Sequence, residues 1–193
     1  MTSWLRLEVM KIRRSRKLAL VSHCILNTNA KIEGTASYPA ALQQVVGLLL
    51  AHHYGIIQLP CPEMRAMGLR RWGQVVEQYA NPFFTESVRS MLVPTLMEIQ
   101  EYVRNGYRVD LLIGIDKSPS CGVNLTCSGD WGGEIGIKKL TESMVVKGEG
   151  VMIRVLRQEM EKLGIPLTMV GVDEDNLSLS IEAIKQAMLR AGS

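Results

Sequence analysis

The chain has 193 residues, 47% of them hydrophobic and 21% charged, and its formal net charge at pH 7 is +3. This length is enough to bury one hydrophobic core, and we expect a single domain over residues 1–193. The basic excess is too small to indicate nucleic-acid binding, so we expect no nucleic-acid partner.

Four short apolar runs are predicted to be buried strands, because they are almost continuously apolar rather than alternating. They lie at residues 17–22, 55–59, 109–115 and 166–172. Helical patterns lie between and after them, at residues 39–53, 85–105, 150–163 and 178–190. This alternation predicts an α/β fold with a three-layer, doubly wound, mostly parallel sheet of about four to five strands.

Local signals predict where two of these helices begin and end. We expect Ser37 to cap the helix at residues 39–53, because serine is a favoured N-cap residue. We expect Thr85 to cap the helix at residues 85–105 and Gly106 to end it.

Three segments fit neither the strand nor the helix pattern. The basic run KIRRSRK at residues 11–17 is typical of a solvated lead-in to a strand, with contact to a phosphate-bearing substrate as the alternative. Residues 60–84 and 122–148 are long connections. Connections of this length in a compact domain are usually functional or contain small elements of their own.

No segment reaches the roughly 18 consecutive apolar residues that a membrane span requires. The best candidate, VVGLLLAHHYGIIQL, is interrupted by His52, His53 and Gly55. The early run LALV is too short for the core of a signal peptide. We therefore expect a cytoplasmic protein without a membrane partner, in which disulfide bonds do not explain the cysteines.

Three of the four cysteines follow predicted strands closely. Cys24 and Cys61 come two residues after the first and second strands, and Cys121 follows the third within one turn. The carboxyl ends of parallel strands share one edge of a sheet, where α/β proteins bind their ligands. We therefore expect these three thiols to converge there, while Cys127 has no such position and no pair has C-x-x-C spacing.

Converging thiolates suit a metal site with one open coordination position. Zinc with three protein ligands and an iron–sulfur cluster with one exposed iron both fit, and the pattern does not separate them. The alternative is three small apolar cysteines that pack at strand ends. The polar motifs around them, SHCILN, PCPEM and KSPSCG, are unlike core sequence.

Together, these motifs resemble those of the thiouracil desulfurase (desulfidase) family, which read SACLLG, CPE and K-x-R-SPSCG. Here they read SHCILN at residues 22–27, CPE at 61–63 and DKSPSCG at 116–122, in the same order. The resemblance extends over residues 17–172 and is weaker in GEGVMIRVLRQEMEKLGIPL. It also implies an α/β enzyme domain.

The resemblance implies a 4Fe–4S cluster held by Cys24, Cys61 and Cys121, with one iron left without a protein ligand. Its implied activity is a non-redox hydrolysis that removes sulfur from a small thiolated nucleobase or thioamide. We expect a monomer or homodimer. The alternatives are a cluster- or metal-binding protein without catalysis and a zinc hydrolase with three cysteine ligands.

Four polar residues in the second and third motifs are the candidates for catalysis. Glu63, two residues after Cys61, is the acid/base candidate. Ser118 and Ser120 are candidates to bind the substrate or position water. Lys117 is a candidate to stabilise developing negative charge.

Other residues carry weaker signals. His23 and Asn27 replace the family's alanine and glycine, and we expect His23 to be a hydrogen-bonded turn residue. His52 and His53 are expected to be structural, and Cys127 as a fourth ligand would close the site. Two groups either bind an anionic or aromatic substrate or solvate turns: Arg70, Arg71 and Trp72, and Asp130 and Trp131.

Overall fold

The computed structural model describes residues 14–130, 132 and 143–191. Within these residues, four parallel strands form one sheet in the order β2-β1-β3-β6. The strands are β1 (Lys17–Val21), β2 (Gly55–Gln58), β3 (Arg108–Ile115) and β6 (Thr168–Val172). All four are strands that the sequence predicts, and the prediction of an α/β fold with a mostly parallel sheet is confirmed.

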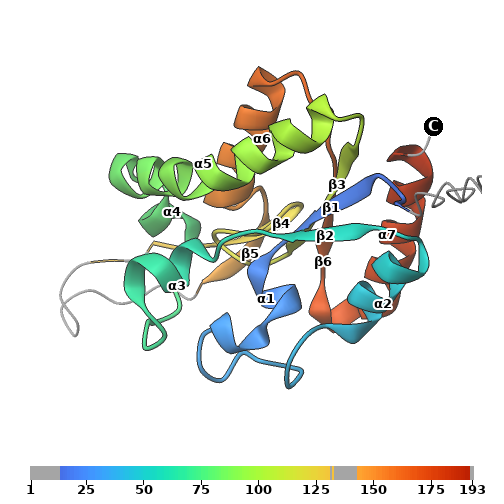
Figure 1. Cartoon of the computed structure of the whole chain (residues 1–193). Helices are drawn as coiled ribbons and strands as arrows, with labels where there is room; N and C mark the ends of the chain where they lie inside the picture. Colours follow the sequence, from blue (N-terminus) through green and yellow to red (C-terminus); the bar gives the residue numbers. More distant parts are fainter. Residues whose placement is uncertain (1–13, 131, 133–142, 192–193) are drawn as a thin grey trace, which may run out of the picture.

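Helices cover both faces of this sheet, which confirms the three-layer, doubly wound prediction (Figure 1). Two of them pack on one face: α5 (Pro82–Arg104) and α6 (Val151–Lys162). Two others pack on the opposite face: α2 (Gln43–Ala51) and α7 (Leu177–Ala191). The four helices overlap the four helical patterns of the sequence.

Strand β1 shows why the strands read as continuous apolar runs. Leu18 and Leu20 point into the core beneath α5 and α6, whereas Ala19 and Val21 point into the core beneath α2 and α7. Successive side chains of a strand alternate between faces, so a strand covered on both sides needs apolar residues at every position. Fully burying a leucine such as Leu20 contributes about 1.5–3 kcal/mol.

The predicted start of the first long helix is wrong. Helix α2 begins at Gln43, and its N-cap position is Leu42 rather than Ser37. The side chain of Leu42 provides no capping hydrogen bond, and Ser37 instead donates to Glu174 at 3.3 Å. The serine signal therefore marks a tertiary contact and not a helix end.

Helix α5 begins earlier than the threonine signal indicates. Its N-cap is Asn81, whose side chain accepts a hydrogen bond from the Phe84 N–H at 2.8 Å, and Pro82 occupies the first turn. An asparagine followed by proline is a stronger start signal than Thr85, which lies inside the helix. At the other end, α5 stops at Arg104, two residues before Gly106 (φ 74°), as predicted.

The two long connections contain small elements, as their length predicts. The first holds α3 (Pro62–Met67) and α4 (Val76–Tyr79). The second holds an antiparallel pair, β4 (Leu125–Ser128) and β5 (Met144–Lys147), which the sequence patterns do not reveal. The remaining short helices are α1 (His23–Leu26), η1 (Thr28–Ala30) and η2 (Glu174–Asn176).

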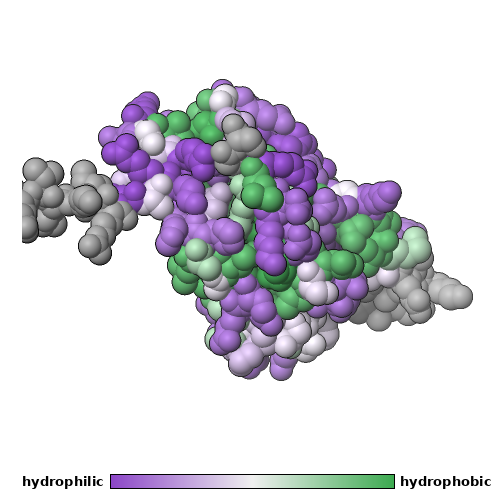
Figure 2. Space-filling model, turned by 90° about the vertical axis from the view of Figure 1, so that its right-hand side faces the viewer, coloured by the Kyte–Doolittle hydropathy of each residue, from purple (hydrophilic) through white to green (hydrophobic). Residues whose placement is uncertain are grey.

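The outer surface is mixed in polarity on the side that Figure 2 shows, which is the right-hand side of Figure 1. Hydrophilic side chains cover most of this face, with smaller hydrophobic groups between them (Figure 2). None of the helices in the described part of the chain combines the length and apolar character of a membrane span. Of the basic run at residues 11–17, residues 11–13 lie outside the described part.

Candidate metal centre

The strand order creates a switch point between β1 and β3. The chain leaves β1 for β2 on one side and later returns to form β3 on the other. Ligands of open parallel sheets bind outside the carboxyl ends of the strands at such a point. In Figure 1, α1 and α3 lie beyond these ends, in the lower part of the molecule.

A cavity of about 290 Å³ opens at this edge of the sheet. Its lining includes three thiols, each from the segment that follows a different strand. It also includes the four polar residues that the sequence singled out for catalysis. The seven predicted site residues that line the same cavity are Cys24, Cys61, Glu63, Lys117, Ser118, Ser120 and Cys121.

The first two thiols lie at the starts of short helices. Cys24 is in the first turn of α1, directly after β1. Cys61 is the N-cap of α3, and its sulfur accepts a hydrogen bond from the Met64 N–H at 3.4 Å. The CPE motif therefore has a local structural reason: Pro62 suits the first helical position, and the sulfur occupies the capping position.

The third thiol is carried by a loop, residues 116–122, that sits on the amino end of α6. The first N–H groups of α6, from Gly150 to Ile153, donate to the carbonyl oxygens of this loop at 2.9–3.3 Å. The acceptors are Pro119, Ser120 and Gly122. The helix thus satisfies its unpaired N–H groups with the backbone on either side of Cys121 and holds that backbone in place.

Asp116 fixes the other side of the same loop. Its carboxylate accepts the backbone N–H groups of Val123, Asn124 and Leu125 at 2.8–3.2 Å. Gly171 leaves the space for this carboxylate, because a Cβ at that position would lie 2.1 Å from the Asp116 Oδ1. The first residue of DKSPSCG is therefore the anchor of the loop, a role typical of aspartate in turns.

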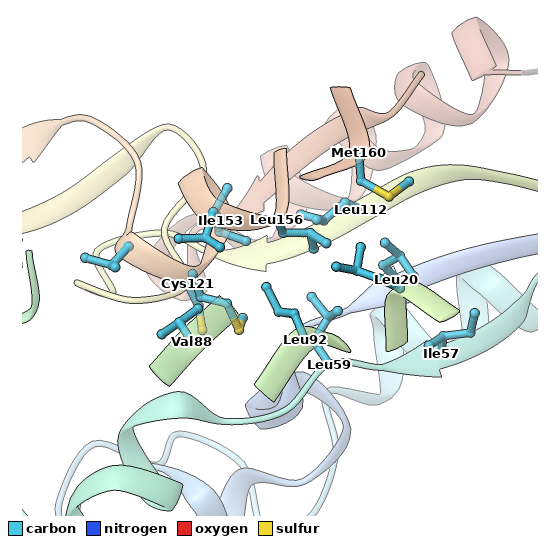
Figure 3. Close-up of a cluster of buried hydrophobic side chains, with 14 of the residues drawn as sticks. Leu20, Ile57, Leu59, Val88, Leu92, Leu112, Cys121, Ile153, Leu156 and Met160 are labelled. Carbon is cyan, nitrogen blue, oxygen red and sulfur yellow. The ribbon is translucent and has the colours of Figure 1, made fainter. Parts of the chain in front are cut away.

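Cys121 lies where the polar cavity meets the apolar core. Its side chain is 5% exposed and belongs to the same buried cluster as Val88 and Ile153 (Figure 3). Its sulfur is 3.3 Å from the Ser120 Oγ. The Ser120 hydroxyl donates to the Glu63 Oε1 at 2.6 Å, so the Cys121 thiol is left as the donor to Ser120.

Glu63 and Arg71 form a buried ion pair in the wall of the cavity. The Arg71 Nε donates to the Glu63 Oε2 at 3.2 Å, and the two side chains are 3% and 8% exposed, Arg71 first. Arg71 also donates to the carbonyl oxygens of Gly68 at 3.1 Å and Ala30 at 2.7 Å. Arg71 therefore contacts the segments that follow both Cys24 and Cys61, and it does not solvate a turn.

Ser118 supports the backbone of the cysteine loop. Its hydroxyl oxygen accepts the N–H groups of Cys121 at 3.0 Å and Ser120 at 3.3 Å. The hydroxyl of Ser118 also lies 3.4 Å from that of Ser120. The two serines therefore form a short polar chain that ends at Glu63.

Lys117 lies at the cavity mouth with a positive φ of 70°. Its ammonium group donates to Asp173 at 2.5 Å and to Asp175 at 2.7 Å. These bonds, to Asp173 first, raise the pKa of Lys117 and lower that of Asp173. Two carboxylates therefore already pair with the cation that the sequence made a candidate to stabilise developing negative charge.

A second ion pair crosses the mouth of the cavity. Lys31 donates to the two carboxylate oxygens of Glu174 at 2.6 and 2.8 Å and lies 5.3 Å from the centre of the Tyr38 ring. The Tyr38 hydroxyl donates to the carbonyl oxygen of Cys24 at 3.0 Å. These contacts connect the segment after Cys24 to the turn after β6.

The three thiols influence one another electrostatically. Burial raises the pKa of Cys24 to about 12, with the charge of Cys61 adding to the effect. Burial, followed by the charges of Cys24 and Glu63, raises the pKa of Cys121 well above its usual range, and burial also raises that of Cys61. Thiols of this kind are poor nucleophiles at neutral pH. A cationic metal centre would deprotonate them.

The three thiols of the cavity were compared with the groupings that bind metal ions. Among the described residues, no three or more His, Cys, Asp and Glu side chains are grouped so that they could hold one metal ion. Three thiols nevertheless line one cavity, and Cys127 is not among its lining residues.

The remaining candidates lie outside the cavity lining. Cys127 is on β4 opposite Val145, so it does not join the other thiols. His23 is partly buried, and burial followed by the charge of Arg65 lowers its pKa. Trp72 is 85% exposed, Arg70 is also exposed, and Trp131 lies outside the described residues.

The sequence patterns did not point to the acidic turn at the cavity mouth. Asp173, Glu174 and Asp175 come directly after β6. The reasoning that singled out the cysteines applies to them too, because they also follow the carboxyl end of a parallel strand. Lys31 carried no comparable signal, since its role depends on a contact with Glu174 across the fold.

Comparisons with known proteins find similarity to two of them. No family model matches the chain. The uncharacterized protein MJ0003 of Methanocaldococcus jannaschii is 32% identical over 152 residues, which are 79% of this chain and 83% of that protein. A solved structure, the 4Fe–4S-dependent thiouracil desulfidase TudS, is similar with a TM-score of 0.46 and 19% identity, over 88% of this chain and 99% of that one.

Proposed function

This chain belongs to the family of MJ0003 from Methanocaldococcus jannaschii, and we propose that it is an iron–sulfur-dependent desulfidase. The observation that carries the proposal is that Cys24, Cys61 and Cys121 line one cavity together with Glu63. The resemblance of SHCILN, CPE and DKSPSCG to desulfidase motifs supports it. The proposed substrate is a small thiolated nucleobase or thioamide.

The proposed reaction is a hydrolysis without net oxidation or reduction. The carbon–sulfur double bond and one water give a carbon–oxygen double bond and hydrogen sulfide, so the oxygen of water replaces sulfur and both of its protons leave on sulfide. A 4Fe–4S cluster held by the three thiolates would supply a Lewis acid that polarises the carbon–sulfur bond. The protein must then position water and move protons.

We assign the movement of those protons to Glu63. Its carboxylate lies in the cavity wall, held by Arg71 on one oxygen and Ser120 on the other. Proton transfer by a positioned carboxylate contributes typically about 10²–10⁴-fold to a rate. Ser118 and Ser120 bind the substrate or orient water at the same wall.

Metal analysis of the anaerobically purified full chain tests the cofactor. We expect about four irons and four sulfides per chain, and loss of both in Cys24→Ser, Cys61→Ser and Cys121→Ser. Cys127→Ser is the matched control and should keep the full iron content. Stoichiometric zinc without iron in anaerobic material would contradict the cluster and favour the zinc alternative.

Sulfide release tests catalysis separately. The reconstituted protein should release sulfide from 2-thiouracil or 4-thiouridine. Glu63→Gln should keep its iron and its visible absorption and lose at least about 100-fold in kcat. A protein that keeps its cluster and releases no sulfide is the non-catalytic cluster binder; Glu63→Gln with normal turnover removes Glu63 from the mechanism.

A further inference from the structure

Ser22, the first residue of the SHCILN motif, has a buried hydroxyl without a partner. The residue is fully buried, and its Oγ makes no hydrogen bond to any other described residue. Ser22 occupies the N-cap position of α1, yet its side chain caps none of the helix N–H groups. An unpaired buried hydroxyl destabilises a fold, and buried polar groups in native structures are nearly always paired. The hydroxyl is therefore free to bind a group that the protein itself does not supply.

Strand β1 fixes the face of the sheet to which this side chain points. Leu18 and Leu20 point to the face that α5 and α6 cover, and Ser22 is the next residue of that alternation. The backbone still follows the sheet at this residue, because the Ser22 N–H donates to the Ile113 carbonyl oxygen at 2.9 Å. Its φ of −56° and ψ of 140° also correspond to extended backbone. Ser22 therefore lies on the face on which Cys121 is buried.

The two neighbouring strands place Ser22 between the segments that carry two of the thiols. On one side, the Leu59 N–H donates to the last carbonyl group of β1 at 2.8 Å, and Cys61 follows two residues later. On the other side, Gly114 is next in the register of β3, and a Cβ there would lie 2.5 Å from the Cys121 carbonyl oxygen. Leu59 and Cys121 belong to one buried cluster (Figure 3).

We propose that the Ser22 hydroxyl donates a hydrogen bond to a sulfur atom of the iron–sulfur cluster. The proposal rests on the cluster of the proposed function and adds a positioning residue for it. Hydrogen bonds to the sulfur atoms of a cluster help to set its reduction potential, and they favour the reduced form because it carries more negative charge. A buried water molecule is the alternative partner of the hydroxyl, and it predicts different results in the experiments below.

Thr28 provides a matched control for this hydroxyl. Among the described residues, Thr28 has the other buried hydroxyl without a partner. Its backbone N–H donates to the Ala40 carbonyl oxygen at 2.7 Å, in the loop that precedes α2, and no strand register directs it to the thiols. Thr28→Val removes an unpaired hydroxyl of the same kind and keeps the shape of the side chain.

The reduction potential of the cluster tests the hydrogen bond directly. Anaerobic potentiometric titration of the reconstituted full chain gives the midpoint potential. Ser22→Ala should lower this potential by about 30–60 mV, which corresponds to a threefold to tenfold weaker preference for the reduced cluster. Thr28→Val should leave the potential unchanged. Iron-loaded Ser22→Ala with the wild-type potential, or an equal shift in both variants, would overturn the proposal.

The stability of the cluster-free chain distinguishes a cluster from water as the partner. Ser22→Ala removes an unpaired hydroxyl, so the melting temperature of the cluster-free full chain should stay unchanged or rise. Ser180→Ala is the contrast, because the Ser180 hydroxyl bonds to the backbone of Asp173 and Asn176, and its loss should lower this melting temperature. A lower melting temperature of cluster-free Ser22→Ala would indicate a water partner and overturn the proposal.

The rate of cluster loss gives the complementary result. With the cluster bound, Ser22→Ala should lose iron to a chelator at least about threefold faster than the wild type, because the hydrogen bond is missing. Thr28→Val should lose iron at the wild-type rate. Equal rates of iron loss in the wild type and Ser22→Ala would overturn the proposal.

Sulfide release separates this proposal from the desulfidase function. A shifted potential in Ser22→Ala, with no sulfide release from 2-thiouracil by the wild type, would support the hydrogen bond and contradict the desulfidase function. Sulfide release by the wild type, with equal potentials in the wild type and Ser22→Ala, would overturn the hydrogen bond alone. A wild-type chain that binds no iron under anaerobic reconstitution would contradict both.

Discussion

The structure gives Arg71 a different role from the two roles that the sequence suggests. The sequence places it in a polar group with Arg70 and Trp72. In the structure it is 3% exposed at the side chain and donates to Glu63 and to two backbone carbonyl groups. It is a positioning residue, because it acts on the reaction through Glu63.

We predict that Arg71→Met lowers the free energy of unfolding by about 3–5 kcal/mol, because it leaves the Glu63 carboxylate buried without its cation. Arg71→Met combined with Glu63→Gln should lose less than the sum of the single changes. Urea unfolding of the full chain under anaerobic conditions measures both effects.

Arg70→Met is the control for this prediction. Arg70 is the exposed neighbour, so its change should stay within about 0.5 kcal/mol. Additive effects of the Arg71 and Glu63 changes would contradict the proposed coupling. The pH dependence of sulfide release should also be measured for Arg71→Lys. A shift of this pH profile would show that Arg71 influences Glu63 in its role as an acid or base.

At the scale of elements, α6 and the cysteine loop form one unit. The amino end of α6 binds the loop carbonyl groups, and Gly150 allows the close approach. A Cβ at Gly150 would lie 2.4 Å from the Ser120 carbonyl carbon and 2.7 Å from the Cys121 nitrogen. These are backbone atoms, so they cannot move aside as a flexible side chain would.

We predict that Gly150→Ala destabilises the protein by about 1–3 kcal/mol, since the added methyl group forces the loop away from α6. It should also reduce iron content, because Cys121 moves with the loop. Thermal unfolding and iron analysis measure the two effects.

Gly47→Ala provides an internal contrast. Gly47 lies within α2, and a Cβ added there would meet no neighbouring element within 4 Å, so alanine should stabilise by about 0.5–1 kcal/mol. If Gly150→Ala were as stable as Gly47→Ala, this result would contradict the close packing of the cysteine loop on α6.

At the scale of the whole molecule, Asp110 is a partly buried carboxylate outside the cavity lining. Asp110 is an extra residue in β3: Leu18 pairs with Val109 and Ala19 with Leu111, which is the pattern of a β-bulge. Its carboxylate oxygens receive no hydrogen bond, although Arg108 lies 3.3 Å away. Burial raises the pKa of Asp110, and the charges of Arg108 and Lys17 only partly oppose this.

The raised pKa predicts a pH-dependent effect on stability. The folded state favours protonated Asp110, so this group stabilises the fold at low pH, and the contribution is lost as pH rises above about 4 through the folded pKa. Asp110→Asn should therefore raise the free energy of unfolding by about 1 kcal/mol at pH 7. The gain should shrink towards pH 4, as thermal unfolding at a series of pH values would measure.

Glu98→Gln removes an exposed carboxylate from α5 and is the control. This change should leave the melting temperature nearly unchanged at pH 7 and at pH 4. A lower melting temperature of Asp110→Asn at pH 7 would show that the ion pair with Arg108 outweighs burial.

The layers of the fold and the meeting of the three thiols follow from the amino-acid sequence alone. Apolar runs covered on both faces are typical of inner parallel strands, and such strands end at one edge of the sheet. Cys24, Cys61 and Cys121 had to lie there once the strands were recognised.

The partners of the charged residues, in contrast, depend on the tertiary structure. Lys117 meets Asp173, and Lys31 meets Glu174, across more than 50 and 140 residues of chain respectively. The antiparallel pair β4 and β5 also emerges only there, because its short strands carry no strong pattern. Periodicity reports which face of an element is buried, whereas pairing between distant side chains depends on how the elements are placed in space.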